Sequence, residues 1–527
     1  MADSKIFPAN SPTSVQASPS ASAGTRSPFP RKTALAVLTA AVLLYAWHRF
    51  RNPAQGLSPA VFLRAARVEL PHPPVNAATV AVAGDAQPAV PGKPMASASV
   101  GARPAISTVL VDDSGALDPF FAALYRLESG KVEVVTILHY GDSPTTADLI
   151  TGDARALLQQ RFGDAGHGFN LVAKPWAWYG HRDVGISDHG WKALTGVGSM
   201  RQGEFGLGGA TLVGGVGAKS TFRLQDASQT DMELDYFTEP DGGRVSIAAD
   251  GVTLATIDTM GTADVPSFKW LHLPPGARQV ELSVTSGEVR LHGIDLRKGD
   301  RGVLYDSLGL NGASTTVISR TFAAETWAAE LRHAKPSLVI INYGTNESSF
   351  GDFVRKQYEG ELRAAIAKLR AAQPDVPILI MGPMDRGERS GVNDIETMPT
   401  IPEITAIQRR VAADERCGFF DTFDAMGGEG TVARWYSAKP RLVTADFIHP
   451  TPQGALLVAR ELVNNLDKGY ERWKHAQGID VPVGSPATHA APSAPSILPA
   501  SLPANPSAAM PSVLPGGVVP SVPQNAH

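Results

Sequence analysis

The chain has 527 residues, 43% of them hydrophobic, which is more than one compact core usually holds and predicts two or more folded units. Its formal net charge of −4 gives no electrostatic support for nucleic-acid binding. The single cysteine, Cys417, excludes an intrachain disulfide and a cysteine-built structural zinc site. No His-Glu-x-x-His motif is present either, so the sequence predicts no metal centre.

The N-terminal segment combines low-complexity sequence with one short apolar run. Residues 1–32 are rich in Ser, Pro and Ala, which predicts disorder. The run ALAVLTAAVLLYAW at 34–47 has basic residues on both sides and predicts a transmembrane signal anchor over 33–48, with a cleaved signal peptide as the alternative. Because both flanks are basic, the positive-inside rule does not settle the orientation. Residues 49–106 are predicted to form a Pro/Ala-rich linker.

Strand-like and helix-like segments alternate on either side of a long interruption. A β-branched run at 131–140 precedes a helical stripe at 145–162. After residue 300 we expect strands at 303–306, 337–342, 377–381 and 419–423, and helices at 321–333, 358–372, 402–413 and 453–466. Such alternation predicts a parallel sheet covered on both faces, built from 107–165 and 300–475.

The interruption at 166–299 has a different pattern. It is rich in glycine, and its short alternating stretches, such as 231–237 and 279–284, are separated by turn sequences such as 240–243. This pattern predicts an inserted all-β module of the jelly-roll or sandwich type. The C-terminal segment 476–527 is rich in Pro, Ala and Ser and is predicted to be disordered.

The first candidate for chemistry is Ser143, in the sequence Tyr-Gly-Asp-Ser-Pro where a predicted strand gives way to a helix. This places Ser143 at the carboxyl edge of the sheet, where open α/β folds bind ligands. Gly141 permits close backbone approach, and Pro144 suits the first turn of a helix. Ser143 could also serve only as a helix cap, so the motif needs partners before it indicates a nucleophile.

A serine nucleophile needs a base, and the best candidate is His449 in Ala-Asp-Phe-Ile-His-Pro. Asp446 lies three residues earlier, so its carboxylate can bond one ring nitrogen and leave the other free for Ser143. An oxyanion hole is also required. Asn346 follows the predicted strand at 337–342 and supplies an amide donor, and Gly312 supplies a backbone N–H, with Gly309 as a rival.

Together these residues resemble the SGNH (GDSL-type) hydrolase family, whose four blocks carry Ser, Gly, Asn and His in that order. The match covers about 107–165 and 300–475. The resemblance implies a flavodoxin-like three-layer α/β fold with a parallel sheet. It implies a catalytic triad of Ser143, Asp446 and His449, an oxyanion hole formed by Ser143, Gly312 and Asn346, and neither a metal nor an organic cofactor.

The position of the all-β insert, between the first and second blocks, is similar to that in bacterial peptidoglycan O-acetylesterases. This resemblance implies a serine esterase that removes O-acetyl groups from a cell-envelope or extracellular polysaccharide through an acyl-serine intermediate. The expected partners are an acetylated glycan and, through 33–48, the inner membrane, with the catalytic domain facing the periplasm or exported. An SGNH-type O-acetyltransferase and a non-catalytic polysaccharide-binding protein stay open, as do the glycan and the acyl group.

Four further positions near the blocks are candidates for supporting roles. The aromatic cluster around Trp176 and Trp178 is predicted to pack between the two units, with a sugar-binding wall as the alternative. His139 is predicted to be a packed strand residue. Asp142 is expected to bond local backbone groups, and Glu347 to support its own turn.

Overall fold

The computed structural model describes residues 109–198, 203–391 and 394–479. The predicted N-terminal tail, signal anchor and linker lie outside the described residues, as do residues 480–527 of the predicted C-terminal tail. Within the described ranges, no helix is long and apolar enough to cross a membrane.

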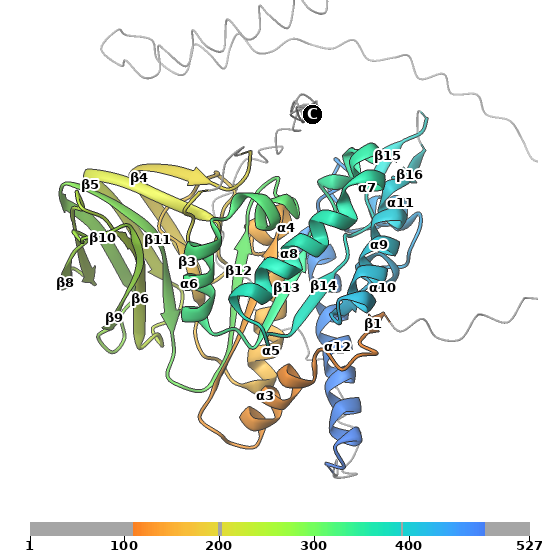
Figure 1. Cartoon of the computed structure of the whole chain (residues 1–527), viewed down its shortest axis with the longest axis horizontal. Coiled ribbons are helices and arrows are strands. Elements are labelled where there is room, and N and C mark those ends of the chain that lie inside the picture. The colour runs from red at the N-terminus through yellow and green to blue at the C-terminus, as the bar shows by residue number, and fades with distance from the viewer. Residues whose placement is uncertain (1–108, 199–202, 392–393, 480–527) are drawn as a thin grey trace, which may run out of the picture. The chain divides into compact units, whose positions relative to one another are not determined.

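A six-stranded sheet forms the centre of the α/β part, as Figure 1 shows. Its spatial order is β1 (Leu110–Val111), β17 (Gly418–Phe420), β14 (Ile378–Met381), β13 (Leu338–Asn342), β2 (Val134–Gly141) and β12 (Gly302–Gly309). Every neighbouring pair is parallel except β1 with β17. Without the antiparallel edge strand, this is the flavodoxin-like order 2-1-3-4-5, as the sequence predicts.

Apolar side chains alternate between the two faces of this sheet, as expected for strands buried on both sides. Val135 and Ile137 belong to one buried cluster, whereas Leu138 and Tyr140 belong to the other. The first face is covered by α3 (Asp118–Glu128), α5 (Ile150–Phe162) and α12 (Pro452–Ala476). The second is covered by α6 (Ala324–Ala334), α8 (Tyr358–Ala372) and α9 (Thr400–Asp414).

Shorter elements connect these layers at the carboxyl edge of the sheet. They are α4 (Ser143–Thr146), the π-helical turn η1 (Val317–Thr321), the 3-10 turn η2 (Glu347–Ser349), α7 (Gly351–Lys356), β15 (Gly387–Arg389), β16 (Ile395–Thr397), α10 (Thr422–Ala425) and α11 (Thr431–Ser437). β15 and β16 form an antiparallel hairpin.

The helix predicted over 145–162 is wrong as one continuous element. The chain forms α4, leaves helical geometry at Asp148 (φ +51°) and resumes as α5. The Asp148 carboxylate explains the break, because it is buried and accepts hydrogen bonds from Thr151, Arg155 and the Arg182 backbone N–H. The left-handed backbone at Asp148 is tolerable because its short polar side chain bonds locally.

The insertion is all-β among its described residues. Its nine strands are β3 (Gly168–Leu171), β4 (Val184–Thr195), β5 (Ala210–Leu224), β6 (Asp231–Thr238), β7 (Arg244–Ala249), β8 (Val252–Asp258), β9 (Val265–His272), β10 (Gln279–Ser286) and β11 (Glu288–Arg297). β3 pairs with β11, with Gly168 opposite Leu296, so the two ends of the insertion meet. Leu212 and Ile294 of this module share one buried cluster with Leu138 and Leu308 of the central sheet.

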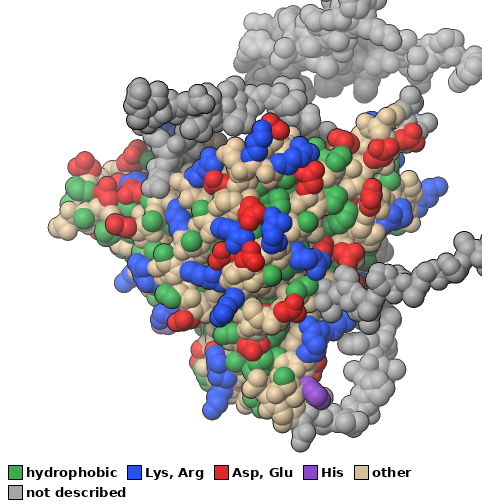
Figure 2. Space-filling view, turned by 45° about the vertical axis from the view of Figure 1, so that its right-hand side comes forward, with side chains coloured by type: hydrophobic (Ala, Val, Ile, Leu, Met, Phe, Trp, Pro, Cys, Tyr) green, Lys and Arg blue, Asp and Glu red, His purple; other side chains and the backbone are tan. Residues whose placement is uncertain are grey.

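The charged side chains of the face in Figure 2 are interspersed, with Lys and Arg beside Asp and Glu. Several surface charges in the described ranges are paired, as in Arg363–Asp414 (2.6 Å) and Arg161–Asp467 (2.5 Å). The face shown in Figure 2 therefore carries no broad field of one sign.

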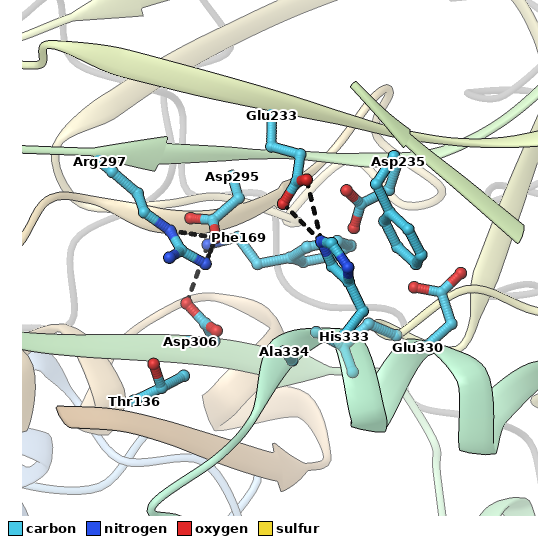
Figure 3. A pocket seen from close by; sticks show the side chains of 12 residues that line it. Thr136, Phe169, Glu233, Asp235, Asp295, Arg297, Asp306, Glu330, His333 and Ala334 are labelled. Atoms are coloured by element: carbon cyan, nitrogen blue, oxygen red, sulfur yellow. Dashed lines mark hydrogen bonds and ion pairs between the residues drawn. The ribbon is translucent and has the colours of Figure 1, made fainter. Parts of the chain in front are cut away.

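A cluster of buried carboxyl groups lies at the seam between the module and the α/β part (Figure 3). The module contributes Glu233, Asp235, Asp295 and Arg297, and the α/β part contributes Asp306, Glu330 and His333. Two contacts partner carboxylates here: the His333 ring lies 2.9 Å from Glu233, and Arg297 forms an ion pair with Asp295 (2.7 Å). One carboxyl oxygen each of Asp235 and Asp295 has no hydrogen-bond partner among the described residues.

Burial and mutual repulsion keep protons on this cluster. Burial, followed by the nearby Asp295 charge, raises the pKa of Asp306 to about 7, and burial beside Glu330 and Glu233 raises the pKa of Asp235 well above its ordinary value. An acid with a raised pKa in the folded state binds more protons there than when unfolded. Asp306 and Asp235 therefore contribute stability at low pH that is lost as pH rises, between about 4 and about 7 for Asp306.

Asp235→Asn should reduce the loss of folding stability with rising pH, because the asparagine amide is neutral at every pH. We expect the variant to gain on the order of 1–3 kcal/mol over the wild type at pH 8 and little at pH 4. Urea unfolding across this pH range measures the difference, and Asp352→Asn on the exposed surface of α7 is the matched control. An unchanged pH slope in Asp235→Asn would show that this carboxyl group is ionised in the folded protein.

Candidate active site

Ser143 is placed by the junction between β2 and α4, at the carboxyl edge of the sheet. Gly141 ends β2, and a Cβ there would lie 2.2 Å from Oγ1 of Thr145, so the tight turn into α4 requires glycine. Ser143 is the first residue of α4. Its backbone N–H therefore has no helical carbonyl four residues earlier to bond and is free for another acceptor. Its side chain is nearly buried, at 7% exposure, and its Oγ lies 2.8 Å from Nε2 of His449.

The loop before α12 holds the other two residues of the predicted triad. Nδ1 of His449 lies 2.7 Å from Oδ2 of Asp446, so the carboxylate holds the ring with Nε2 directed at Ser143. Oδ1 of Asp446 accepts from the Thr444 hydroxyl (2.6 Å) and from the backbone N–H groups of Ile448 (2.9 Å) and His449 (3.1 Å). The structure therefore brings all three residues into one hydrogen-bonded chain.

The electrostatics of Asp446 favour its ionised form. Burial alone would raise its pKa, but hydrogen bonds from His449, Thr444 and Ile448 outweigh it and hold the pKa well below the usual range. Phe447, between the two triad residues, has a left-handed backbone (φ +61°), and its ring is buried at 4.8 Å from that of Tyr436. This anchored turn keeps Asp446 and His449 on the same side of the loop.

Two predicted oxyanion donors lie in neighbouring loops. Gly312 follows β12 in a left-handed conformation (φ +76°) and is exposed, so its backbone can approach a ligand. Nδ2 of Asn346 donates to the carbonyl of Ala313 (2.8 Å), which leaves its second N–H for another acceptor. Gly309 serves packing instead, because a Cβ there would lie 2.0 Å from the Thr146 backbone nitrogen.

Glu347 joins these two loops, a wider role than support of its own turn. One carboxylate oxygen accepts from the backbone N–H (2.8 Å) and hydroxyl (2.9 Å) of Thr315, and the other accepts from the Gly344 N–H (3.1 Å). Glu347 is 2% exposed, and burial raises its pKa. One buried side chain thus sets the spacing between Gly312 and Asn346.

Asp142 makes no side-chain cap bond to α4, but its carboxylate bonds its own backbone N–H, which agrees with the predicted local backbone contact. It is buried, its side chain bonds Thr345, and its Oδ2 has no partner among the described residues. Burial raises the pKa of Asp142 to about 7, although the Thr345 hydrogen bond and the His449 charge oppose the rise. Asp142 thus connects the turn that carries Ser143 with the turn that carries Asn346.

The remaining candidates divide between packing and the rim of the site. His139 is fully buried, lies 2.7 Å from the Tyr305 hydroxyl, and has a pKa lowered to about 4 by burial, so it is a packed strand residue. Trp176 packs against the core shared with the module, as predicted for the cluster. Trp178 instead donates its indole N–H to the side chain of Asn311 (3.1 Å), the residue before Gly312, and so lies beside the loop that carries Gly312.

Sequence reasoning missed Arg386, in the loop between β14 and β15. Its Nη1 donates to the Thr345 carbonyl (2.8 Å) and to the Ser348 hydroxyl (3.0 Å), on either side of Asn346 in sequence. The available signal was its position just after a parallel strand, at the sheet edge that carries Ser143. Among the described residues, no group of three or more His, Cys, Asp or Glu side chains is arranged to hold a metal ion.

Asn346→Ala should lower kcat by about 10²–10³-fold, the usual cost of one oxyanion donor, while the fold survives. Initial rates with 4-nitrophenyl acetate, together with thermal unfolding of the same samples, measure both effects. Asn465→Ala on α12, which also removes an amide that bonds a backbone carbonyl, is the matched control. Unchanged turnover in a folded Asn346→Ala protein would remove Asn346 from the site.

Comparison with known proteins adds a family and a fold. Residues 290–457 match the GDSL-like lipase/acylhydrolase family. No curated protein sequence matches the chain. Among solved structures, a peptidoglycan O-acetylesterase has a TM-score of 0.59 and 24% identity over 69% of this chain and 99% of that one.

Two carbohydrate esterases are also similar at lower scores. A family two carbohydrate esterase from Clostridium thermocellum has a TM-score of 0.24 and 14% identity over 56% of this chain and 99% of that one. A family 3 carbohydrate esterase from Talaromyces cellulolyticus has a TM-score of 0.24 and 17% identity over 33% of this chain and 73% of that one. Residues 290–457 thus match the GDSL-like lipase/acylhydrolase family, and the chain is similar in fold to a peptidoglycan O-acetylesterase.

Proposed function

We propose that this protein is a serine esterase that removes O-acetyl groups from a cell-envelope or extracellular polysaccharide. The observation that carries the proposal is the hydrogen-bonded chain from Ser143 through His449 to Asp446, beside two loops that present oxyanion donors. The all-β module next to this site and the fold shared with a peptidoglycan O-acetylesterase support a polysaccharide substrate.

The proposed reaction has two halves. Ser143 Oγ attacks the acetyl carbonyl carbon while His449 Nε2 takes the serine proton, and the oxyanion faces the Ser143 and Gly312 N–H groups and the Asn346 amide. The tetrahedral intermediate collapses as His449 returns that proton to the leaving sugar oxygen. Water then attacks the acetyl-serine and loses a proton to His449, and the second intermediate collapses to acetate as His449 returns that proton to Ser143 Oγ.

Acetate release tests this function. The purified full chain should hydrolyse 4-nitrophenyl acetate and release acetate from O-acetylated glycans, whereas Ser143→Ala should do neither. If acetyl groups instead appear on an added saccharide acceptor without free acetate, the protein is an O-acetyltransferase. Saturable glycan binding without any acyl chemistry would make it a binding protein.

We also propose that the catalytic part lies outside the cytoplasmic membrane, tethered through 33–48 and the linker at 49–106. The apolar run at 34–47 and the Pro/Ala-rich stretch after it support this, and an envelope glycan would lie on that side. An alkaline phosphatase fusion at the C-terminus should be active. An inactive phosphatase fusion paired with a fluorescent cytoplasmic reporter would overturn the location and the envelope substrate, but not the serine chemistry.

A further inference from the structure

Arg386 is a half-buried cation beside the catalytic residues that the proposed chemistry does not use. Its Nη1 is occupied by the Thr345 carbonyl and the Ser348 hydroxyl, which anchor the guanidinium to the turn carrying Asn346. Nε and Nη2 have no acceptor among the described residues. Arg386 therefore presents two fixed, unused donor groups.

No carboxylate of the described residues lies within ion-pair distance of Arg386. Arg155 shows the usual arrangement, since it is 1% exposed and pairs with Asp148 (2.5 Å) and Asp183 (3.5 Å). A cation taken out of water is normally paired, because its lost hydration must be replaced. Burial accordingly lowers the pKa of Arg386, a cost that a bound anion would offset.

The location of Arg386 places such an anion at the catalytic centre. The carboxyl groups that act electrostatically on Arg386 are those of Asp446 of the triad, Glu388 and Asp142 beside Ser143. It lies between the turn that carries Asn346 and the loop that carries His449, because its neighbour Gly387 donates to the Phe447 carbonyl (2.9 Å). An anion bound there would belong to the same molecule as the acetyl group under attack.

We propose that Arg386 binds a carboxylate of the acetylated saccharide and makes the enzyme selective for acidic glycans. The planar guanidinium matches a carboxylate with two parallel hydrogen bonds, which its unused Nε and Nη2 can supply. A singly charged carboxylate suits the site better than a dianionic phosphate, because Asp446 and Glu388 repel the extra charge. The carboxylate could come from a uronic acid residue or from a muramyl-peptide unit. This inference rests on the proposed polysaccharide esterase function.

The kinetic test compares substrates with and without a carboxylate. Arg386→Met should lower kcat/KM by about 10–100-fold on O-acetylated polyuronate or on O-acetylated muramyl-peptide glycan, the usual loss for a charge-assisted bond. The loss on acetylated glucomannan and 4-nitrophenyl acetate should be at least about tenfold smaller, because these substrates lose only the two hydrogen bonds from Arg386 to the turn that carries Asn346. The acidic substrate that the wild type prefers identifies the source of the carboxylate. Arg441→Met is the matched control, since Arg441 is exposed and stacks on Tyr436 near the same loop.

If Arg386 only stabilises the turn that carries Asn346 and binds no carboxylate, a different result is expected. Arg386→Met would then lose activity equally on neutral and acidic substrates, and that outcome overturns the proposal. Equal wild-type activity on acidic and neutral glycans would also overturn it. Arg386→Lys keeps the charge but not the planar fork, so it should recover only part of the activity on the acidic substrate.

A binding experiment separates this inference from the esterase function. Ser143→Ala retains Arg386 but not the nucleophile, so calorimetry can follow deacetylated oligouronate or muramyl-peptide oligomers without turnover. One of them should bind at least about tenfold more tightly than a neutral oligosaccharide, and the preference should vanish in Ser143→Ala/Arg386→Met. If the wild type deacetylates no glycan but this preference is present, the esterase function fails and the carboxylate site stands. Equal binding of acidic and neutral oligomers refutes the site whether or not the enzyme is active.

Discussion

Ser143→Ala should lower kcat on 4-nitrophenyl acetate by about 10⁴–10⁶-fold, the range for loss of a serine nucleophile that works with a histidine. The reason is specific to this geometry. Oγ of Ser143 is the group within 2.8 Å of His449 Nε2, so without it the base has no nucleophile to activate. Any residual rate would come from water activated by His449 beside intact oxyanion donors.

The control for this prediction is Ser319→Ala, which removes a hydroxyl that bonds Glu361 far from the triad in sequence. It should leave kcat unchanged. A fluorophosphonate probe followed by mass spectrometry should label the wild type on the peptide that contains Ser143 and should not label Ser143→Ala. Labelling at another serine, with activity preserved in Ser143→Ala, would transfer the nucleophile role to that residue.

Asp446→Asn should cost about 10⁴-fold in kcat, because the amide would select the wrong form of His449. Oδ1 of Asp446 accepts three hydrogen bonds, so the single amide oxygen of asparagine would occupy that position. The NH₂ group would then face His449 Nδ1 in place of Oδ2 and donate to it. The ring proton would move to Nε2, which could no longer accept the Ser143 proton.

Thr444→Val is the matched control for Asp446→Asn. It removes one of the three donors to Oδ1 and leaves the bond between Oδ2 and His449 in place, so it should cost about tenfold or less. Steady-state kinetics and unfolding curves of both variants measure the comparison. If Asp446→Asn loses no more activity than Thr444→Val, Asp446 only supports the loop and does not orient the histidine.

The spacing of apolar residues along the sequence predicted the helices and strands that depend on contacts between residues close in sequence. The helical stripe at 358–372 coincides with α8, and the apolar runs around 338–342 and 377–381 correspond to β13 and β14. The break at Asp148 was missed because its cause is a contact with Arg182, more than thirty residues away. α12 continues ten residues beyond the predicted end at 466, where Tyr470 packs against Phe162 of α5.

The same distinction applies to the candidate site. Strand ends of a parallel sheet share one edge, so the order of the blocks alone placed Ser143, Gly312, Asn346 and His449 near one another. The links between them could not be predicted. Glu347 bonds a residue 32 positions away, and Arg386 bonds one 41 positions away, and such pairings depend on how loops pack. The carboxyl cluster at the seam likewise pairs Glu233 with His333, 100 positions apart.

The pairing of β3 with β11, which joins the two ends of the inserted module, has a consequence for the order of folding. β2 must pair with β12, yet the chain from Gly141 to Gly302 separates them, and closing so long a loop costs conformational entropy. The strand pairs inside the module all span shorter stretches of chain, from the neighbouring strands β7 and β8 to the widest pair, β3 and β11. Once β3 has paired with β11, Gly168 lies opposite Leu296, and the remaining connection between β2 and β12 is short. If the insertion folds first, it therefore brings β2, the strand that precedes Ser143, close to its partner β12.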